Sequence, residues 1–125
     1  MSNHPERVIQ FNIVNWLRQK HPGIKFQANI SEQKATLAWR DIQDRMGFRK
    51  GVSDLFFPAG STLADNPKQE VYKGLWVELK TNIGRPTKEQ VQFIDDMIKL
   101  GYAGFITYGY QEAEDTIRRF YNLKD

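Results

Sequence analysis

The chain has 125 residues, which is enough for one domain with a hydrophobic core. Its 18 lysines and arginines against 15 acidic residues give a net charge of +3, which permits a nucleic-acid partner without requiring one. The absence of cysteine excludes disulfides, thiolate metal sites and a cysteine nucleophile, and the lack of a long apolar run or signal peptide predicts a soluble, cytoplasmic protein without membrane segments.

The first half of the chain predicts two helices and two strands. A helix over residues 5–20 begins with Pro5 and Glu6, which suit a first helical turn. Glu6 is in line with the apolar stripe of this helix, so it is either an ordinary first-turn acid or a carboxylate with a role in a site. The other predicted elements are a strand over 24–30, a helix over about 32–46 and a short strand over 52–57.

The second half predicts a loop, two strands and two helices. The loop over 58–71 contains prolines and polar residues. A central strand follows at 72–80, then a helix that begins near Pro86 or Thr87 and ends at Gly101, a strand over 103–108 and a helix over about 111–121. This alternation, without repeats or an internal linker, indicates one α/β domain.

The most informative stretch lies at the end of the predicted central strand. Glu78 and Lys80 are two residues apart, so they share one face of the strand with Trp76. Asp54 lies near the start of the preceding short strand, and antiparallel pairing of the two strands would place it beside that face. The pair Glu78 and Lys80 is either a solvent-facing ion pair or part of a site, and Asp54 is either a turn residue or a third member.

These residue types suit a metal-assisted hydrolysis of phosphodiesters. Two carboxylates, Asp54 and Glu78, and a backbone carbonyl such as that of Leu79 make an oxygen-rich site for Mg²⁺ or Mn²⁺. Such an ion acidifies a bound water, and Lys80 would orient that water and offset charge in the transition state. Glu6 could add a further carboxylate to the ion or its water shell.

Gln90 has two interpretations. It follows Thr87 by three residues, so it fits the reciprocal position of a capping box. It also lies in line with Ile94 and Met97, on the helix face that should pack against the sheet, where it could hold Lys80 or the water in place.

Taken together, these motifs resemble the VRR-NUC nucleases of the PD-(D/E)xK superfamily. The resemblance is carried by Gly51-Val52-Ser53-Asp54, by Trp76-Val77-Glu78-Leu79-Lys80-Thr81 and by Gly84-Arg85-Pro86-Thr87 followed by Gln90. It extends over nearly the whole chain. The chain departs from the superfamily pattern at Ser53, where a proline usually precedes the aspartate.

The resemblance implies a single VRR-NUC domain over residues 1–125 with a restriction-endonuclease-like core, in which helices flank a central mixed sheet of about four strands. It implies that Mg²⁺ or Mn²⁺ is the cofactor. At the matching positions Asp54 and Glu78 would be metal ligands, Lys80 the catalytic lysine, Gln90 an accessory glutamine and Glu6 the acid of the first helix.

Stand-alone members of this size resemble phage or bacterial resolvases that act as homodimers on four-way DNA junctions. The resemblance therefore implies branched DNA as the substrate, a homodimer, and the cytoplasm of a bacterium or phage-infected cell. Flap or duplex cleavage, a DNA-binding module without catalysis and a purely structural partner remain alternatives. Basic residues that flank the site on turns, and would contact DNA phosphates, are Arg49, Lys50, Arg85 and Lys88.

Overall fold

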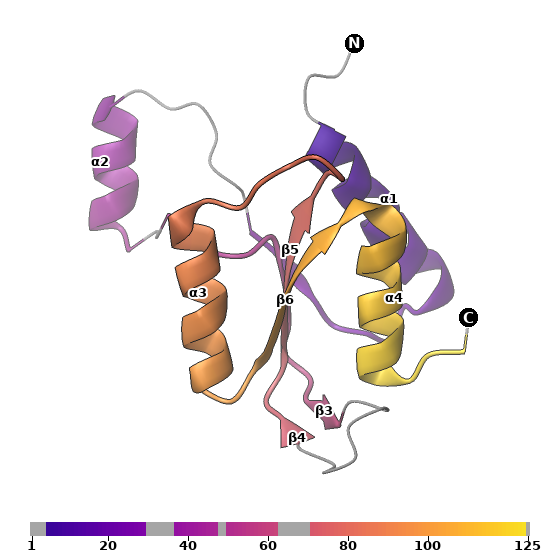
Figure 1. Ribbon diagram of the computed structural model, residues 1–125. Coiled ribbons are helices and arrows are strands. Elements are labelled where there is room, and N and C mark those ends of the chain that lie inside the picture. Colours follow the sequence, from indigo (N-terminus) through magenta and orange to yellow (C-terminus); the bar gives the residue numbers. More distant parts are fainter. Residues whose placement is uncertain (1–4, 30–36, 48–49, 63–70, 125) are drawn as a thin grey trace.

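The computed structural model describes residues 5–29, 37–47, 50–62 and 71–124. Figure 1 shows a central sheet with α3 on one face and α1 and α4 on the other, which confirms the predicted α/β class. The elements in chain order are α1 (Pro5–Lys20), β1 (Gln27–Ala28), α2 (Leu37–Arg45), β2 (Leu55–Phe57), β3 (Ser61–Thr62), β4 (Val71–Tyr72), β5 (Leu75–Lys80), α3 (Lys88–Lys99), β6 (Ala103–Tyr108) and α4 (Gly109–Tyr121).

The central sheet has four strands in the order β1-β2-β5-β6. β1 pairs with β2 and β2 with β5 in antiparallel fashion, whereas β5 and β6 are parallel. The parallel pair needs a crossover connection, which α3 supplies across one face of the sheet. The predicted mixed sheet of about four strands flanked by helices is therefore confirmed, as is the antiparallel pairing of β2 with β5.

The strands predicted over 24–30, 52–57 and 72–80 are shorter than expected, whereas β6 spans the predicted 103–108. The predicted strand over 24–30 is regular only at Gln27–Ala28 among its described residues, and the strand over 72–80 is divided, because Tyr72 belongs to a small hairpin of β3 and β4. The division falls at Gly74, where a side-chain carbon would lie 2.6 Å from the carbonyl oxygen of Phe57. The prediction of an irregular loop over 58–71 was wrong at Ser61–Thr62 and at Val71, which belong to the strands of this hairpin. Residues 63–70 of the predicted loop lie outside the described part of the chain.

The helix boundaries agree better with the sequence. α1 spans the predicted 5–20, and α3 follows a capping box formed by Thr87 and Gln90. α4 begins at Gly109, two residues before the predicted 111, and α2 covers the described part of the predicted helix over 32–46 except Met46. None of the described helices combines the length and apolar character needed to cross a membrane.

The two faces of the sheet carry different side chains. The face under α3 is aromatic: Trp76 stacks on Phe56 with ring centroids 4.2 Å apart and meets the edge of Phe93 at 4.8 Å. Because side chains alternate along a strand, Glu78 and Lys80 follow Trp76 on this face. The opposite face joins α1 and α4 in the main core, which includes Ile13, Leu17, Leu55, Phe57, Leu75, Val77, Leu79, Ala113, Ile117 and Phe120.

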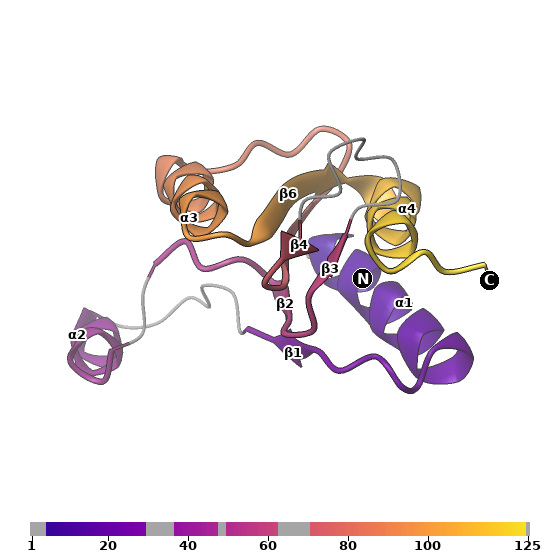
Figure 2. The same cartoon turned by 90° about the horizontal axis from the view of Figure 1, so that it is seen from below.

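The helix α2 stands away from the rest of the described structure, as both views show (Figures 1 and 2). Its apolar residue Ile42 is 40% exposed, and Met46, just beyond its end, is 67% exposed. The domain core therefore consists of the central sheet with α1, α3 and α4.

Candidate active site

The candidate site lies where β5 ends and β2 begins. The pairing of Leu55 with Val77 places Asp54, one residue before β2, opposite Glu78. All three charged groups of the predicted constellation are buried: Glu78 is 2% exposed, Lys80 6% and Asp54 7%. A solvent-facing ion pair, the ordinary structural interpretation of Glu78 and Lys80, is therefore wrong.

The carboxylate of Asp54 is fixed by the backbone of the neighbouring strand. Its Oδ2 accepts a hydrogen bond of 2.7 Å from the backbone N–H of Leu79. On the other side, Asn29 donates its backbone N–H to the carbonyl of Asp54 at 2.8 Å and its side-chain amide to the carbonyl of Ser53 at 2.9 Å. The Leu79 N–H thus holds the Asp54 side chain toward β5, and Asn29 holds the backbone of Asp54 from the other side.

Glu78 lies in an unfavourable environment for an isolated carboxylate. Its Oε1 is buried and has no hydrogen-bond partner among the described residues. Burial, followed by repulsion from the Asp54 carboxylate, raises the pKa of Glu78 to about 9. Burial also raises the pKa of Asp54, against the lowering effect of the Leu79 N–H. Two adjacent buried acids of this kind are stable as a charged pair only when a cation neutralises them.

Lys80 supplies one positive charge to this cluster. Its Nζ lies 3.8 Å from Oε2 of Glu78 and 3.7 Å from Oε2 of Glu6. The Glu6 side chain comes from the first turn of α1 and is 43% exposed, so it reaches the cluster from the solvent side. Both contacts exceed normal hydrogen-bond length, which leaves the ammonium able to donate to a further oxygen.

The structure brings Glu6, Asp54, Glu78 and Lys80 together and places Gln90 in a different contact. The Gln90 Oε1 accepts from the backbone N–H of Thr87 at 2.8 Å, and its own backbone N–H donates to the Thr87 hydroxyl at 3.1 Å. The capping interpretation of Gln90 is confirmed. Its role in catalysis stays a prediction, which would require the side-chain amide to leave the cap or to act through Nε2.

Three of the predicted DNA-contacting residues lie in the described part of the chain: Lys50 and Arg85 are outside helices and strands, and Lys88 is the first residue of α3. Gly51 packs against the backbone of Glu89, so the exposed Lys50 lies beside the start of α3 and near Lys88. A side-chain carbon on Gly84 would lie 3.4 Å from Oε2 of Glu6, so the exposed Arg85 follows directly after a close approach to the site. Arg49 lies outside the described residues.

The donor set fits a hard divalent cation. Asp54 has a second oxygen beyond the one bound by Leu79, and Glu78 has an unpartnered buried oxygen. No three histidine or acidic side chains of the described residues form a ligand cluster of their own. Mg²⁺ does not require such a cluster, because it is commonly held by one or two carboxylates and keeps several waters.

Two residues that support the site were not identified from the sequence. Asn29 holds the backbone that carries Asp54, and the buried hydroxyl of Thr107 donates to the carbonyl of Glu78 at 3.0 Å. Neither residue belongs to a motif. Their importance depends on strand neighbours 24 and 29 residues away, which a local pattern does not reveal.

We expect the substitution Gly51→Ala to lower the free energy of unfolding by about 1–3 kcal/mol. Gly51 has a φ of +87°, and an added Cβ would lie 2.6 Å from the carbonyl carbon of Glu89. Urea denaturation measures the change. Gly23→Ala is the matched control, because among the described residues no atom beyond its own chain neighbours lies within 4 Å of the added carbon. An equal loss in both variants would contradict the prediction.

Comparison with known proteins supports the fold. No family model and no curated protein matches the chain. A solved structure named "VRR_NUC domain protein" aligns with 100% of this chain and 94% of its own, with a TM-score of 0.76 and 22% sequence identity. The fold implied by the sequence motifs is thereby confirmed.

Proposed function

We propose that this chain, which has the fold of a VRR_NUC domain protein, is a metal-dependent endonuclease that hydrolyses phosphodiester bonds in DNA. The observation that carries the proposal is the buried pair of Asp54 and Glu78 beside Lys80, with one Glu78 oxygen unpartnered. A protein gains no stability from burying two adjacent acids without a cation. The arrangement is therefore explained best by a function that uses a bound cation.

Asp54, Glu78 and the backbone carbonyl of Leu79 would hold the ion, with Glu6 as a further carboxylate at the exposed side. Mg²⁺ or Mn²⁺, when bound, supplies positive charge for a phosphate group and a water of lowered pKa. The Leu79 N–H keeps the Asp54 carboxylate in position for this role. Thr107 does the same for the backbone of Glu78.

Lys80 has the position of a catalytic lysine. Glu6 and Glu78 hold its ammonium from two sides, so it can donate to an attacking water or to a phosphate oxygen. Donation to the phosphate would stabilise the negative charge that develops in the transition state. Donation to the water would orient it for attack.

The proposed substrate is branched DNA, with a four-way junction as the first candidate. Symmetric resolution of a junction requires two cuts, and this domain offers one site, so the proposal includes a homodimer. The basic residues Lys50, Arg85 and Lys88, with Arg49, would contact phosphates. Flap or duplex cleavage by the same chemistry, in phage DNA processing or in repair, is the second candidate.

The test is cleavage of a labelled panel by the purified protein: a four-way junction, a flap, a splayed arm and a linear duplex, each with Mg²⁺, Mn²⁺ or EDTA. Paired symmetric nicks in the junction alone, lost in EDTA, would establish the resolvase. Cleavage of flaps or duplex would keep the nuclease and reject junction resolution. DNA binding without metal-dependent cleavage of any substrate would reject the enzyme and favour a binding module; neither binding nor cleavage would favour a structural partner.

The variant Gln90→Glu separates the two roles of Gln90. Glutamate suits the reciprocal position of a capping box as well as glutamine, so we expect an unchanged melting temperature. We expect the cleavage rate to fall about tenfold, because the exchange removes an amide donor and adds a negative charge two residues from Lys88, which is proposed to contact phosphates. Single-turnover kinetics measures the rate. An unchanged rate would assign Gln90 to the helix cap alone.

A further inference from the structure

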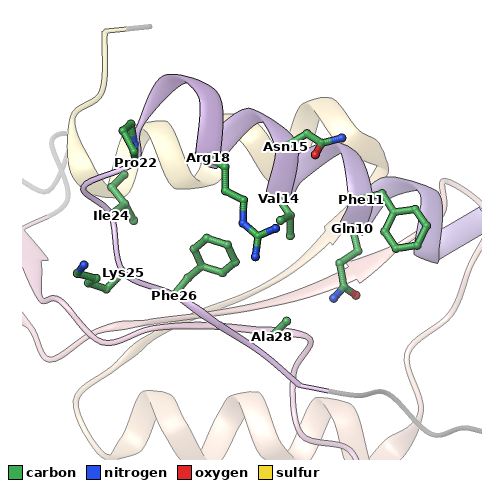
Figure 3. Close-up of a pocket in the computed structure, with 10 residues that line it drawn as sticks. All are labelled: Gln10, Phe11, Val14, Asn15, Arg18, Pro22, Ile24, Lys25, Phe26 and Ala28. Atoms are coloured by element: carbon green, nitrogen blue, oxygen red, sulfur yellow. The ribbon is translucent and has the colours of Figure 1, made fainter.

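A groove runs beside the first helix, on the face of the sheet opposite α3. It has a volume of about 700 Å³ and lies between α1 and the segment that leads into the edge strand β1 (Figure 3). Gln10, Phe11, Val14 and Arg18 line it from the helix. Lys25 and Phe26 are among the residues that line it from the other side.

The lining combines positive charge with aromatic surface. Arg18 and Lys25 are cations, and no carboxylate is among the described residues that line the groove. Phe11 is 59% exposed, an unusual position for a large apolar ring. Figure 3 shows the guanidinium of Arg18 and the ring of Phe26 directed into the same space. Cations alongside accessible aromatic rings are the surface that single-stranded nucleic acids use, because the rings stack on unpaired bases.

One end of the groove lies toward the Glu6 side of the candidate active site, although the side chains of Glu78 and Lys80 are on the sheet face under α3. Gln10 lies one helical turn after Glu6, whose carboxylate contacts Lys80. Across from it, Ala28 lines the groove and immediately precedes Asn29, which holds the backbone of Asp54. From Gln10 to Arg18 the helix rises about 12 Å, which matches three to four stacked nucleotides at about 3.4 Å each.

We propose that this groove binds an unpaired DNA strand, three to four nucleotides long, that extends from the cleavage site along α1. Paired bases stack on each other inside a duplex and are not available to Phe11, so the groove would select single strands. The inference takes DNA as the ligand from the proposed function. It does not depend on whether the site cuts.

The test is fluorescence anisotropy of the full chain with labelled dT12 and with a duplex of equal length, in EDTA so that no cleavage occurs. We expect Arg18→Glu combined with Lys25→Glu to weaken dT12 binding at least tenfold. The slope of log K against log salt should fall by about 1.4, as loss of two phosphate contacts predicts. Phe11→Ala should weaken dT12 binding about tenfold and leave duplex binding unchanged.

Matched controls are Lys124→Glu, an exposed charge reversal outside the groove, and Val8→Ala, an exposed apolar truncation on the same helix. Unchanged dT12 affinity in the groove variants would overturn the inference even if the protein cleaves DNA. Loss of dT12 binding only in these variants would support it even if no cleavage is found. Light scattering measures the oligomeric state of the groove variants and of the wild type. If the groove variants form smaller assemblies than the wild type but still bind dT12, the groove is a contact between copies of the chain, and the inference is overturned.

Discussion

Replacement of Lys80 by alanine is expected to lower the rate of metal-dependent DNA cleavage by about 100- to 1,000-fold. The Lys80 ammonium is 6% exposed and is held between Glu6 and Glu78, so bulk solvent offers no equivalent donor at that position. The affinity for DNA should change much less, because the exposed basic residues Lys50, Arg85 and Lys88 remain. Single-turnover cleavage with protein in excess measures the rate, and anisotropy in EDTA measures affinity.

Lys99→Ala is the matched control for this variant. Lys99 is exposed and pairs only with Asp95 on its own helix among the described contacts, so its loss should leave the rate unchanged. Removal of Lys80 takes away the positive charge beside the carboxylates of Glu6 and Glu78 and could destabilise the fold. Circular dichroism would show whether the Lys80 variant is folded. A folded Lys80→Ala protein that cleaves at the wild-type rate would reject the assignment of Lys80 as catalytic.

The second large effect is expected from Glu78→Gln, which should abolish cleavage and stabilise the metal-free protein. The pKa of Glu78 is about 9 in the folded state, against an ordinary value of 4.5. The folded state therefore binds the proton more tightly than the unfolded state, and this contribution to stability is lost as the pH rises from about 4.5 to about 9. Glutamine cannot ionise, so the variant should gain about 1–3 kcal/mol at pH 8 and should lose this pH dependence.

Urea denaturation in EDTA at pH 5 and pH 8 measures both quantities. The variants should differ at pH 8, where the unfolded wild type has released the Glu78 proton that the folded state still holds. They should converge toward pH 5 and below, where the unfolded state also binds this proton. Added Mg²⁺ should raise the melting temperature of the wild type and have little effect on Glu78→Gln, because a ligand stabilises only the state that binds it. The exchange Glu112→Gln is the control, because Glu112 is exposed and its Oε1 accepts the backbone N–H of Tyr108 at 2.8 Å, a bond that a glutamine oxygen can also accept. A Glu78 variant that is less stable than the wild type at pH 8 would contradict the burial argument.

The sequence by itself determined the fold class and the core of the candidate site. The helical spacing of α1, the capping box before α3 and the β-prone run of β6 are local features, so they could be read without the fold. The spacing of Glu78 and Lys80 placed both on one face of a strand, and the motif around them implied the partner Asp54. Local periodicity and turn chemistry are encoded within a few residues, which is why these predictions were correct.

The tertiary structure determined which charged side chains are buried, where the strand over 72–80 is divided and which distant segments meet at the site. Burial of Glu78 and Lys80 depends on α3 and on neighbouring strands, and it separated a buried site from a surface ion pair. The division of the strand over 72–80 depends on the close approach of Gly74 to Phe57. The support of Asp54 by Asn29, and the groove beside α1, arise from segments that are distant in the chain. Such contacts form only when folding brings the segments together, so the physical environment of each charge was fixed by the fold and not by its sequence neighbours.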